Sequence, residues 1–195
     1  MNGRSGTIHV IDDDEDLARS LARLFVRQGW NARAFVHARE AELAHRTEGA
    51  VCLVTDVMLG GAHGFDLAKT LRAIDPAASI VFMTAWPATS DAVDAIRRHG
   101  GVDYLEKPLD EARLLAAVRE GLDWSASRRR AESRLKDLSS RERQILDLVI
   151  QGKSSKTIAL ELDISPKTVE DHRASIRAKT GAATLEALIK LTMLR

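Results

Sequence analysis

Acidic, hydroxyl and ammonium side chains follow four short apolar segments of this chain. In chain order they are Asp12 and Asp13, Asp56, Thr84, and Lys107. Parallel strands gather their carboxyl ends along one edge of a sheet, so side chains at these positions would converge there. Carboxylate oxygens suit a hard divalent cation such as Mg²⁺, while a hydroxyl and an ammonium group can donate hydrogen bonds to phosphoryl oxygens. The set therefore predicts a site for a divalent metal and a phosphoryl group.

Five short segments have the apolar character of strands, and helical periodicity follows each of them. Strands are expected over 7–11, 31–35, 51–55, 79–83 and 102–105. Helices are expected before Gly29, near 37–47, 64–74 and 89–99, and along the stretch that carries Leu114, Leu115, Val118 and Leu122. Five βα units predict an α/β fold with a doubly wound parallel sheet, the (βα)5 arrangement, and helices on both faces.

The length and composition are typical of a soluble globular protein. The 195 residues allow one large domain or two small ones, and 45% are hydrophobic and 29% charged. No apolar stretch is long enough to cross a bilayer, and the start of the chain leaves no room for a signal peptide, so we expect a cytoplasmic protein with no membrane partner. The single cysteine, Cys52, excludes an intrachain disulfide. Five histidines show no ligand spacing and are expected at the surface or in strands: His9, His37, His45, His63 and His99.

The charge of the chain is unevenly distributed. Residues 1–125 carry 14 Lys and Arg against 19 Asp and Glu, a formal charge of −5. Residues 126–195 carry 15 against 9, a formal charge of +6. An acidic half joined to a basic half suggests that the second half meets nucleic acid.

The second half of the chain has helical signals only. Helices are expected near 140–151, 155–161, 166–180 and 184–193. A polar stretch over 125–137 either forms a flexible connector or continues the preceding helix. Ser139 and Glu142 form a capping-box pattern, and Ser165-Pro166 is a favourable helix start. Two helices joined by the short turn at 163–164 match the helix-turn-helix pattern. We expect domains at 6–123 and 138–195, with a linker over 124–137.

The first domain resembles the receiver domain of bacterial two-component response regulators. The resemblance rests on Asp12-Asp13, Asp56, Thr84-Ala85 and Lys107-Pro108 in this order and on these elements. It implies that Asp56 accepts a phosphoryl group, and that Asp12, Asp13, Asp56 and the backbone carbonyl of Met58 hold Mg²⁺. It further implies that Thr84 and Lys107 bind the phosphoryl group, that Tyr104 reorients, and that the Lys107–Pro108 peptide is cis. Such a receiver is no enzyme in the usual sense, although it assists its own Mg-dependent phosphorylation and dephosphorylation.

The second domain resembles the LuxR-type helix-turn-helix of the FixJ/NarL response regulators. The resemblance rests on Leu-Ser-Ser-Arg-Glu-Arg-Gln-Ile-Leu from residue 138 and Ile-Ser-Pro-Lys-Thr-Val-Glu-Asp-His from residue 164. It implies a four-helix, all-α domain whose recognition helix spans 166–180. Candidate DNA contacts are Lys153, Lys156, Lys167, Thr168, Glu170, Asp171, Arg173, Arg177 and Lys179. Acidic side chains accept hydrogen bonds from cytosine N4 but repel phosphates, so the base preference stays open.

The two resemblances together predict a phosphorylation-dependent transcription regulator. The expected partners are a sensor histidine kinase, double-stranded promoter DNA and a second copy of the chain on phosphorylation, with RNA polymerase as a further candidate. An alternative is a divergent receiver controlled by protein contact or constitutive dimerisation, because Gly60 replaces a usual proline and a bulky Trp86 lies near Thr84. A phosphohydrolase with an aspartyl-phosphate intermediate is disfavoured, because Met58 stands where a second catalytic acid would be needed.

Overall fold

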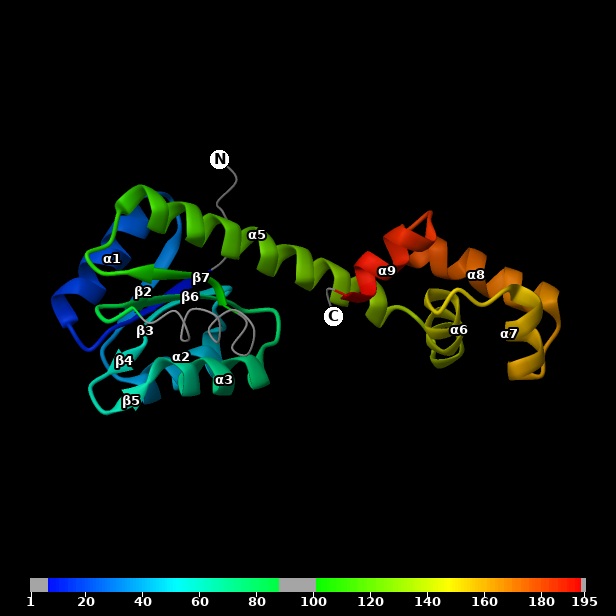
Figure 1. The fold of residues 1–195 in the computed structure, drawn as a ribbon, viewed down its shortest axis with the longest axis horizontal. Helices are drawn as coiled ribbons and strands as arrows, with labels where there is room; N and C mark the ends of the chain where they lie inside the picture. The colour runs from blue at the N-terminus through cyan, green and yellow to red at the C-terminus, as the bar shows by residue number, and fades with distance from the viewer. Residues whose placement is uncertain (1–6, 88–100, 194–195) are drawn as a thin grey trace. The chain divides into compact units, whose positions relative to one another are not determined.

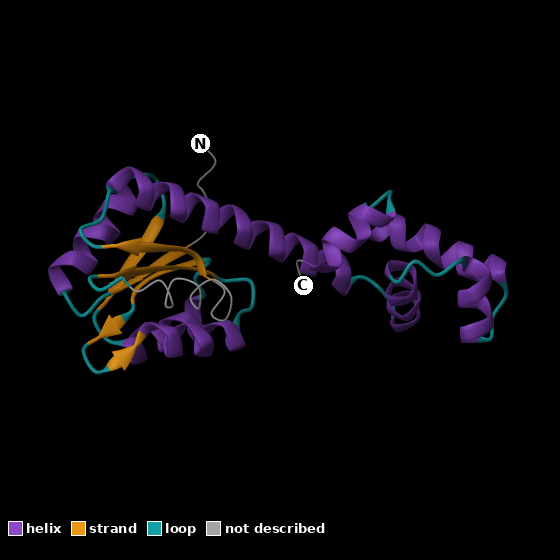
Figure 2. Cartoon of the chain, viewed as in Figure 1, coloured by secondary structure: helices purple, strands orange, loops and turns teal. Residues whose placement is uncertain are grey.

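The computed structural model describes residues 7–87 and 101–193. The chain divides into two compact units, Met1–Ala126 and Ser127–Arg195. The first unit combines a sheet with helices, whereas the second contains helices among its described residues (Figures 1 and 2). In the part of the chain that the structure describes, no helix has both the length and the apolar character needed to cross a bilayer.

A five-stranded parallel sheet forms the centre of the first unit. Its strands lie in the order β2-β1-β3-β6-β7. Their bounds are β1 Thr7–Ile11, β2 Asn31–Phe35, β3 Cys52–Asp56, β6 Ser79–Thr84 and β7 Gly101–Glu106. This is the predicted doubly wound sheet, because the chain order reverses direction across β1 and β3. The predicted fold class is therefore confirmed, with strand ends within one residue of the predicted ones.

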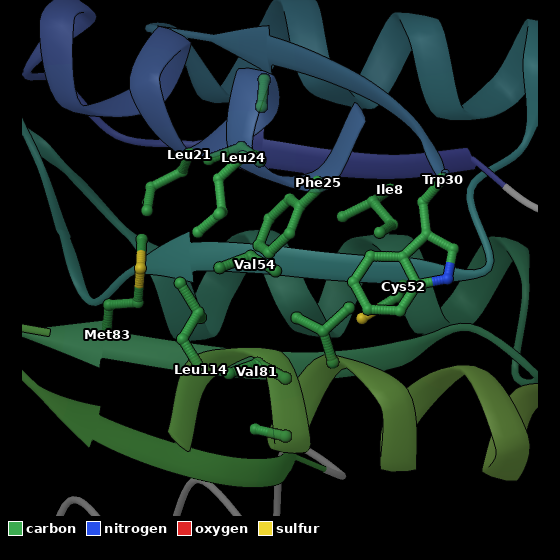
Figure 3. Close-up of a cluster of buried hydrophobic side chains, with 14 of the residues drawn as sticks. Ile8, Leu21, Leu24, Phe25, Trp30, Cys52, Val54, Val81, Met83 and Leu114 are labelled. Carbon is green, nitrogen blue, oxygen red and sulfur yellow. The ribbon is translucent and has the colours of Figure 1, made fainter. Parts of the chain in front are cut away.

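Helices cover both faces of this sheet (Figure 1). Helices α1 (Glu15–Arg27) and α5 (Glu111–Lys136) cover one face, and α2 (Ala38–Glu48) and α3 (Gly64–Ile74) cover the other. Alternation along each strand divides the core: Ile8 and Val10 face α1 and α5, whereas Ile11 faces α2 and α3. Figure 3 shows the first of these clusters, in which Phe25 of α1 lies against strand residues. The helix predicted near 89–99 lies outside the described residues.

A short hairpin follows β3 and was not predicted. Strands β4 (Met58–Leu59) and β5 (Ala62–His63) pair in antiparallel fashion directly after Asp56. The turn between them contains Gly60 and Gly61 with φ values of 53° and 110°. Positive φ is accessible to glycine at little cost, so these two residues allow the tight reversal.

The polar connector is helical. Helix α5 extends to Lys136, across the stretch for which the sequence left a flexible connector and a continued helix open. Leu114, Ala117 and Val118 near its start pack in the first core, whereas Ala131 and Leu135 near its end belong to the core of the second unit. The change of partner along α5 coincides with the division of the chain at Ala126.

The described residues of the second unit form four further helices, at the predicted places. They are α6 Ser140–Ile150, α7 Ser155–Leu162, α8 Pro166–Thr180 and α9 Leu185–Met193. Ser139 and Glu142 form the predicted capping box, and Ser154 and Ser165 cap α7 and α8. Asp163 adopts the left-handed conformation with φ 51° and closes α7 just before α8 begins.

A buried carboxylate holds α8 against α6. Glu142 is almost completely buried and accepts hydrogen bonds from Ser139 N at 2.7 Å, Ser175 Oγ at 2.6 Å and Lys179 Nζ at 2.7 Å. The hydrogen bonds from Lys179 and Ser175 lower the pKa of Glu142 to about 2. The capping box was readable from the sequence, but the contacts with α8 were not, since they join residues more than 30 positions apart.

Two histidines lie inside the first unit. His9 on β1 and His45 on α2 are both buried, with ring centroids 6.2 Å apart. His9 lies in a strand as predicted, whereas the placement of His45 at the surface or in a strand was wrong. Its Nδ1 accepts a hydrogen bond from Ala50 N at 3.2 Å, and the buried ring fills the space between α2 and the sheet. Neither ring nitrogen of His9 has a hydrogen-bond partner among the described residues.

The stability of the first unit should fall as the pH drops below neutrality because of His9. Burial, then the proximity of His45 and Arg33, lower the pKa of His9 to about 4, with Glu48 opposing. The unfolded chain binds a proton at His9 near pH 6.5, so between about 6.5 and 4 unfolding takes up a proton. When the pH is lowered from about 7 to about 5, protonation of His9 in the unfolded chain should decrease the free energy of unfolding by about 2 kcal/mol.

Urea unfolding of wild type, His9→Leu and His37→Gln at these two pH values tests this expectation. All three tryptophans, Trp30, Trp86 and Trp124, belong to the first unit, so their fluorescence reports its unfolding alone. His9→Leu should lose less stability on acidification than wild type, whereas the exposed His37 is the matched control and its loss should equal that of wild type. Equal losses in all three proteins would contradict the assignment to His9.

Neutralising Glu142 should destabilise the second unit. Glu142→Gln keeps the shape of the side chain but removes the negative charge of the group that accepts from Lys179. This change should lower the free energy of unfolding by about 1–3 kcal/mol. Far-UV circular dichroism measures the transition, with tryptophan fluorescence separating the first unit. Glu186→Gln, on the exposed surface of α9, is the matched control. Combining Glu142→Gln with Lys179→Met should cost less than the sum of the two changes, and strict additivity would show that the pair is not coupled.

Candidate functional site

The register of the sheet brings the predicted site residues to one edge. Asp12 follows β1, Asp56 ends β3 and Thr84 ends β6. Ile11 is the register partner of Thr55, Asp56 of Met83, and Thr84 of Glu106. The last residues of neighbouring strands therefore lie side by side, and the side chains that follow them share the carboxyl edge of the sheet.

Lys107 links two carboxylates at this edge. Its Nζ donates to Asp12 Oδ2 at 2.7 Å and also to Asp56 Oδ2. Asp12 and Asp56 are buried, whereas the Lys107 side chain is 17% exposed. Burial raises the pKa of the Asp12 carboxyl, and hydrogen bonds from Lys107 and from the Asp14 backbone only partly offset it. Burial acts to lower the pKa of Lys107, but the hydrogen bonds to both aspartates and their negative charges together outweigh it and raise that pKa.

A third carboxylate completes an oxygen-rich cluster. One carboxylate oxygen from each of Asp12, Asp13 and Asp56 lies within 4.8 Å of the other two. Asp13 is exposed, while the other two are buried. Three hard oxygen ligands with one open, solvated side fit Mg²⁺, which takes few protein ligands and keeps several waters. Asp56 Oδ1 accepts from Met58 N at 3.0 Å, which fixes the plane of this carboxylate.

The loop after Asp56 approaches the site closely. A Cβ at Gly60 would stand 3.3 Å from Asp13 Oδ2, and the φ of 53° at this residue is unavailable to proline, whose ring holds φ near −65°. A proline in place of Gly60 could therefore not form the β4–β5 hairpin as it stands here. Gly64, the first residue of α3, is held against Asp56 so tightly that a Cβ there would stand 2.1 Å from the Asp56 carbonyl oxygen.

Thr84, Trp86 and Tyr104 occupy different environments around the cluster. Thr84 is buried, and its Oγ1 accepts from Trp86 N at 3.1 Å. Its hydroxyl proton therefore remains available to an acceptor in the site. Trp86 is 76% exposed and is not part of the core. Tyr104 is partly buried and packs against the hydrophobic cluster of α2 and α3. The Lys107–Pro108 peptide is cis, as the resemblance implied.

The candidate nucleic-acid contacts lie mainly on one helix. Val169, Ile176 and Thr180 form the buried side of α8. The predicted core position His172 is partly buried. Exposed on α8 are Pro166, Lys167, Glu170, Asp171, Ala174, Arg177, Ala178 and Lys179, while Thr168 and Arg173 are partly buried.

Most of the predicted phosphate contacts are engaged within the domain. Lys153 Nζ binds Glu161 at 2.7 and 2.8 Å, and Lys179 Nζ binds Glu142. Arg173 donates to Ser155 Oγ at 3.3 Å, and Ser155 in turn donates to Glu170. Lys167 Nζ lies 3.2 Å from Asp171 Oδ1. For Lys156 and Arg177 the described residues show no such pair. Sequence reasoning missed these internal partners because Ser155 and Glu161 carry no signal that would link them to a helix-turn-helix surface.

Comparison with known families agrees with the geometry of both units. Residues 8–119 match the family "Response regulator receiver domain", and residues 136–192 match "Bacterial regulatory proteins, luxR family". The chain is a response regulator of the FixJ/NarL family. A receiver joined to a LuxR-type helix-turn-helix makes it a two-component, DNA-binding transcription regulator.

Full-length relatives support this placement of the regulator. It is 38% identical over 194 residues to the transcriptional regulatory protein FixJ of Azorhizobium caulinodans, covering 96% of this chain and 92% of that protein. The structure of full-length FixJ from B. japonicum is 36% identical, has a TM-score of 0.54 and is matched over 97% of both chains. A structure of the response regulator StyR is 34% identical, with a TM-score of 0.57 and coverage of 98% and 100%.

Enlarging Gly64 should damage the site more than it damages the fold. The Cβ of Gly64→Ala collides with the backbone oxygen of Asp56, so the strand end must move and carry the Asp56 carboxylate with it. We expect the yield of phosphorylated regulator from acetyl phosphate, measured by intact mass, to fall at least about tenfold, with a stability loss of about 1–3 kcal/mol.

Gly49→Ala is the matched control for this prediction. Gly49 also has a positive φ, 70°, but a Cβ there meets nothing within 4 Å. The control should lose stability from backbone strain and still become phosphorylated to the wild-type extent. Full phosphorylation of Gly64→Ala would show that Asp56 tolerates movement of this strand end.

Proposed function

We propose that phosphorylation of Asp56 by a sensor histidine kinase switches the regulator into a DNA-binding homodimer. The observation that carries this proposal is the Lys107 ammonium group placed between the buried carboxylates of Asp12 and Asp56. A positive charge at this point suits a group that alternates between a carboxylate and an aspartyl phosphate. The family supports a kinase and promoter DNA as partners.

The chemical step is a phosphoryl transfer to a carboxylate. An oxygen of Asp56 attacks the phosphorus of a kinase phosphohistidine, the phosphorus–nitrogen bond breaks, and its electron pair leaves on the histidine nitrogen. Lys107 stays within reach of the transferred group and offsets charge on its oxygens. Thr84 directs its free hydroxyl proton to one of these oxygens, since its own oxygen already accepts from Trp86 N. The regulator thus assists its own modification without acting on a separate substrate.

A magnesium ion fits the remaining carboxylates. Asp12, Asp13 and Asp56 would hold Mg²⁺ together with the backbone carbonyl of Met58, and the ion would neutralise negative charge during the transfer. The exposed position of Asp13 leaves the cluster open to solvent on one side, where a phosphodonor can enter.

The phosphorylated regulator differs from the unphosphorylated one in the charge at Asp56 and in the hydrogen bonds of Thr84. The phosphoryl group adds about 1.5 to 2 negative charges and new acceptor oxygens. Thr84 moves toward these oxygens, and Tyr104, which packs at the edge of the hydrophobic cluster, turns into the space that Thr84 leaves. The surface at β7 then changes shape and pairs with the same surface of a second copy.

Dimerisation couples the switch to DNA. Two α8 helices enter successive major grooves about one helical turn apart, and linkage of two weak contacts makes the complex tight. Lys156 and Arg177 are the cations best placed to bind DNA phosphates, because the other basic candidates already have partners within the domain. RNA polymerase is the further partner through which the bound regulator acts on transcription. These partners place the regulator in the cytoplasm.

Sedimentation tests the phosphate switch without knowledge of the DNA site. Wild type and Asp56→Asn are compared with Mg²⁺, with and without beryllofluoride or acetyl phosphate. Wild type should shift from monomer to dimer on activation, whereas Asp56→Asn should stay monomeric, because its amide neither attacks phosphorus nor binds the fluoride complex. Asp66→Asn, on the exposed side of α3, is the matched control and should dimerise like wild type.

The other outcomes separate the alternatives. A dimer in every sample would favour constitutive dimerisation by a divergent receiver. A monomer in every sample, with Asp56 phosphorylated by mass, would show that the switch does not act through dimerisation.

A further inference from the structure

The outward side of α8 combines small residues with one exposed ion pair. Ala174 and Ala178 are exposed and leave room for close approach to a groove floor. Lys167 and Asp171, one turn apart in the first half of the helix, form an ion pair of 3.2 Å. Their side chains are 85% and 66% exposed, which is more than in the pairs Arg128–Glu132, Lys153–Glu161 and Lys179–Glu142 of the same unit.

Stability does not account for this pair. Exposed pairs at i,i+4 contribute little, since water screens both charges and two long side chains lose freedom. A carboxylate on a helix that enters the major groove also faces two rows of phosphates. It is repelled there unless a base donates a hydrogen bond to it.

Glu170 is the contrasting case on the same helix. Its carboxylate accepts from Ser155 Oγ on α7, and Ser155 also accepts from Arg173. This acid therefore has a structural partner that ties α7 to α8. Asp171 has only Lys167 among the described residues, and that partner is itself free to donate further hydrogen bonds.

We propose that Asp171 and Lys167 together read one C·G base pair in each half-site of the DNA. Asp171 accepts from cytosine N4, and Lys167 donates to O6 and N7 of the paired guanine. The inference rests on the proposed DNA-binding function and names the base preference of that surface.

An A·T pair fits the same two side chains less well. Adenine N6 also donates, but the acceptor N7 lies beside it on the same base and repels a carboxylate. On its own base, cytosine has only C–H beside N4 in the major groove, and the paired guanine offers two acceptors, O6 and N7, and no donor there. An ammonium group beside a carboxylate is therefore complementary to C·G, whereas the mixed donor and acceptor of an amide suit adenine.

Selection from randomised duplexes tests the base preference. Full-length regulator activated with Mg²⁺ and beryllofluoride is used as wild type, Asp171→Ala and Asp171→Asn. Wild type should select a fixed C·G pair in each half-site, and replacing that pair by T·A should weaken binding about tenfold or more. Replacing its cytosine by 2-pyrimidinone, which lacks the N4 amino group, should weaken wild type but not Asp171→Ala. Asp171→Asn should shift the preference at this one pair to A·T.

Asp147→Ala is the matched control for overall charge. Asp147 is an exposed acid on α6 of the same unit, so its removal changes the net charge equally without altering α8. Its base preferences should equal those of wild type. The inference is overturned if Asp171→Ala keeps every wild-type preference, or if it binds all duplexes more tightly by one common factor. Failure of activated wild type to bind any duplex would overturn the DNA-binding proposal itself, a result distinct from either.

Discussion

The ion pairs between Lys107 and two buried aspartates are the constraint on which the first unit depends. Asp12 and Asp56 come from neighbouring strands and would repel each other at the edge of the sheet without a cation between them. Lys107 arrives from the end of a third strand, so β1, β3 and β7 must end at the same level for the three groups to meet. The parallel sheet is thus required by the site as much as by the apolar residues that pack its two faces.

Backbone contacts act together with Lys107 to fix the position of Asp56. Met58 N binds its carboxylate, and Gly64 lies against its carbonyl oxygen with no space for a side chain. The β4–β5 hairpin joins these two contacts through glycines that adopt positive φ. A loop this tight transmits small movements of Asp56 to the start of α3, since neither contact has room to absorb them.

The second unit uses much of its positive charge to hold itself together. Lys179 is bound to the buried Glu142 and Lys153 to Glu161, so the basic character of this half overstates the charge that faces DNA. The same contacts set the orientation of α8 against α6. Because fewer cations are unpaired, the affinity for DNA irrespective of its sequence is lower. Recognition therefore depends more on the side chains along the outward side of α8.

The sequence by itself determined the fold class and the family. The strand and helix periods, the capping serines and the spaced Asp, Thr and Lys residues are local signals, and each depends on only a few neighbouring residues. Tertiary structure alone decided which charges meet. Glu142 reads as a helix cap, yet its strongest partners lie on α8, and His45 has no local feature that marks it as buried beside His9. The hairpin after Asp56 and the pairing of Ser155 with Glu170 were likewise invisible. Side-chain partners distant in sequence depend on the relative placement of whole elements, and no local pattern encodes that placement.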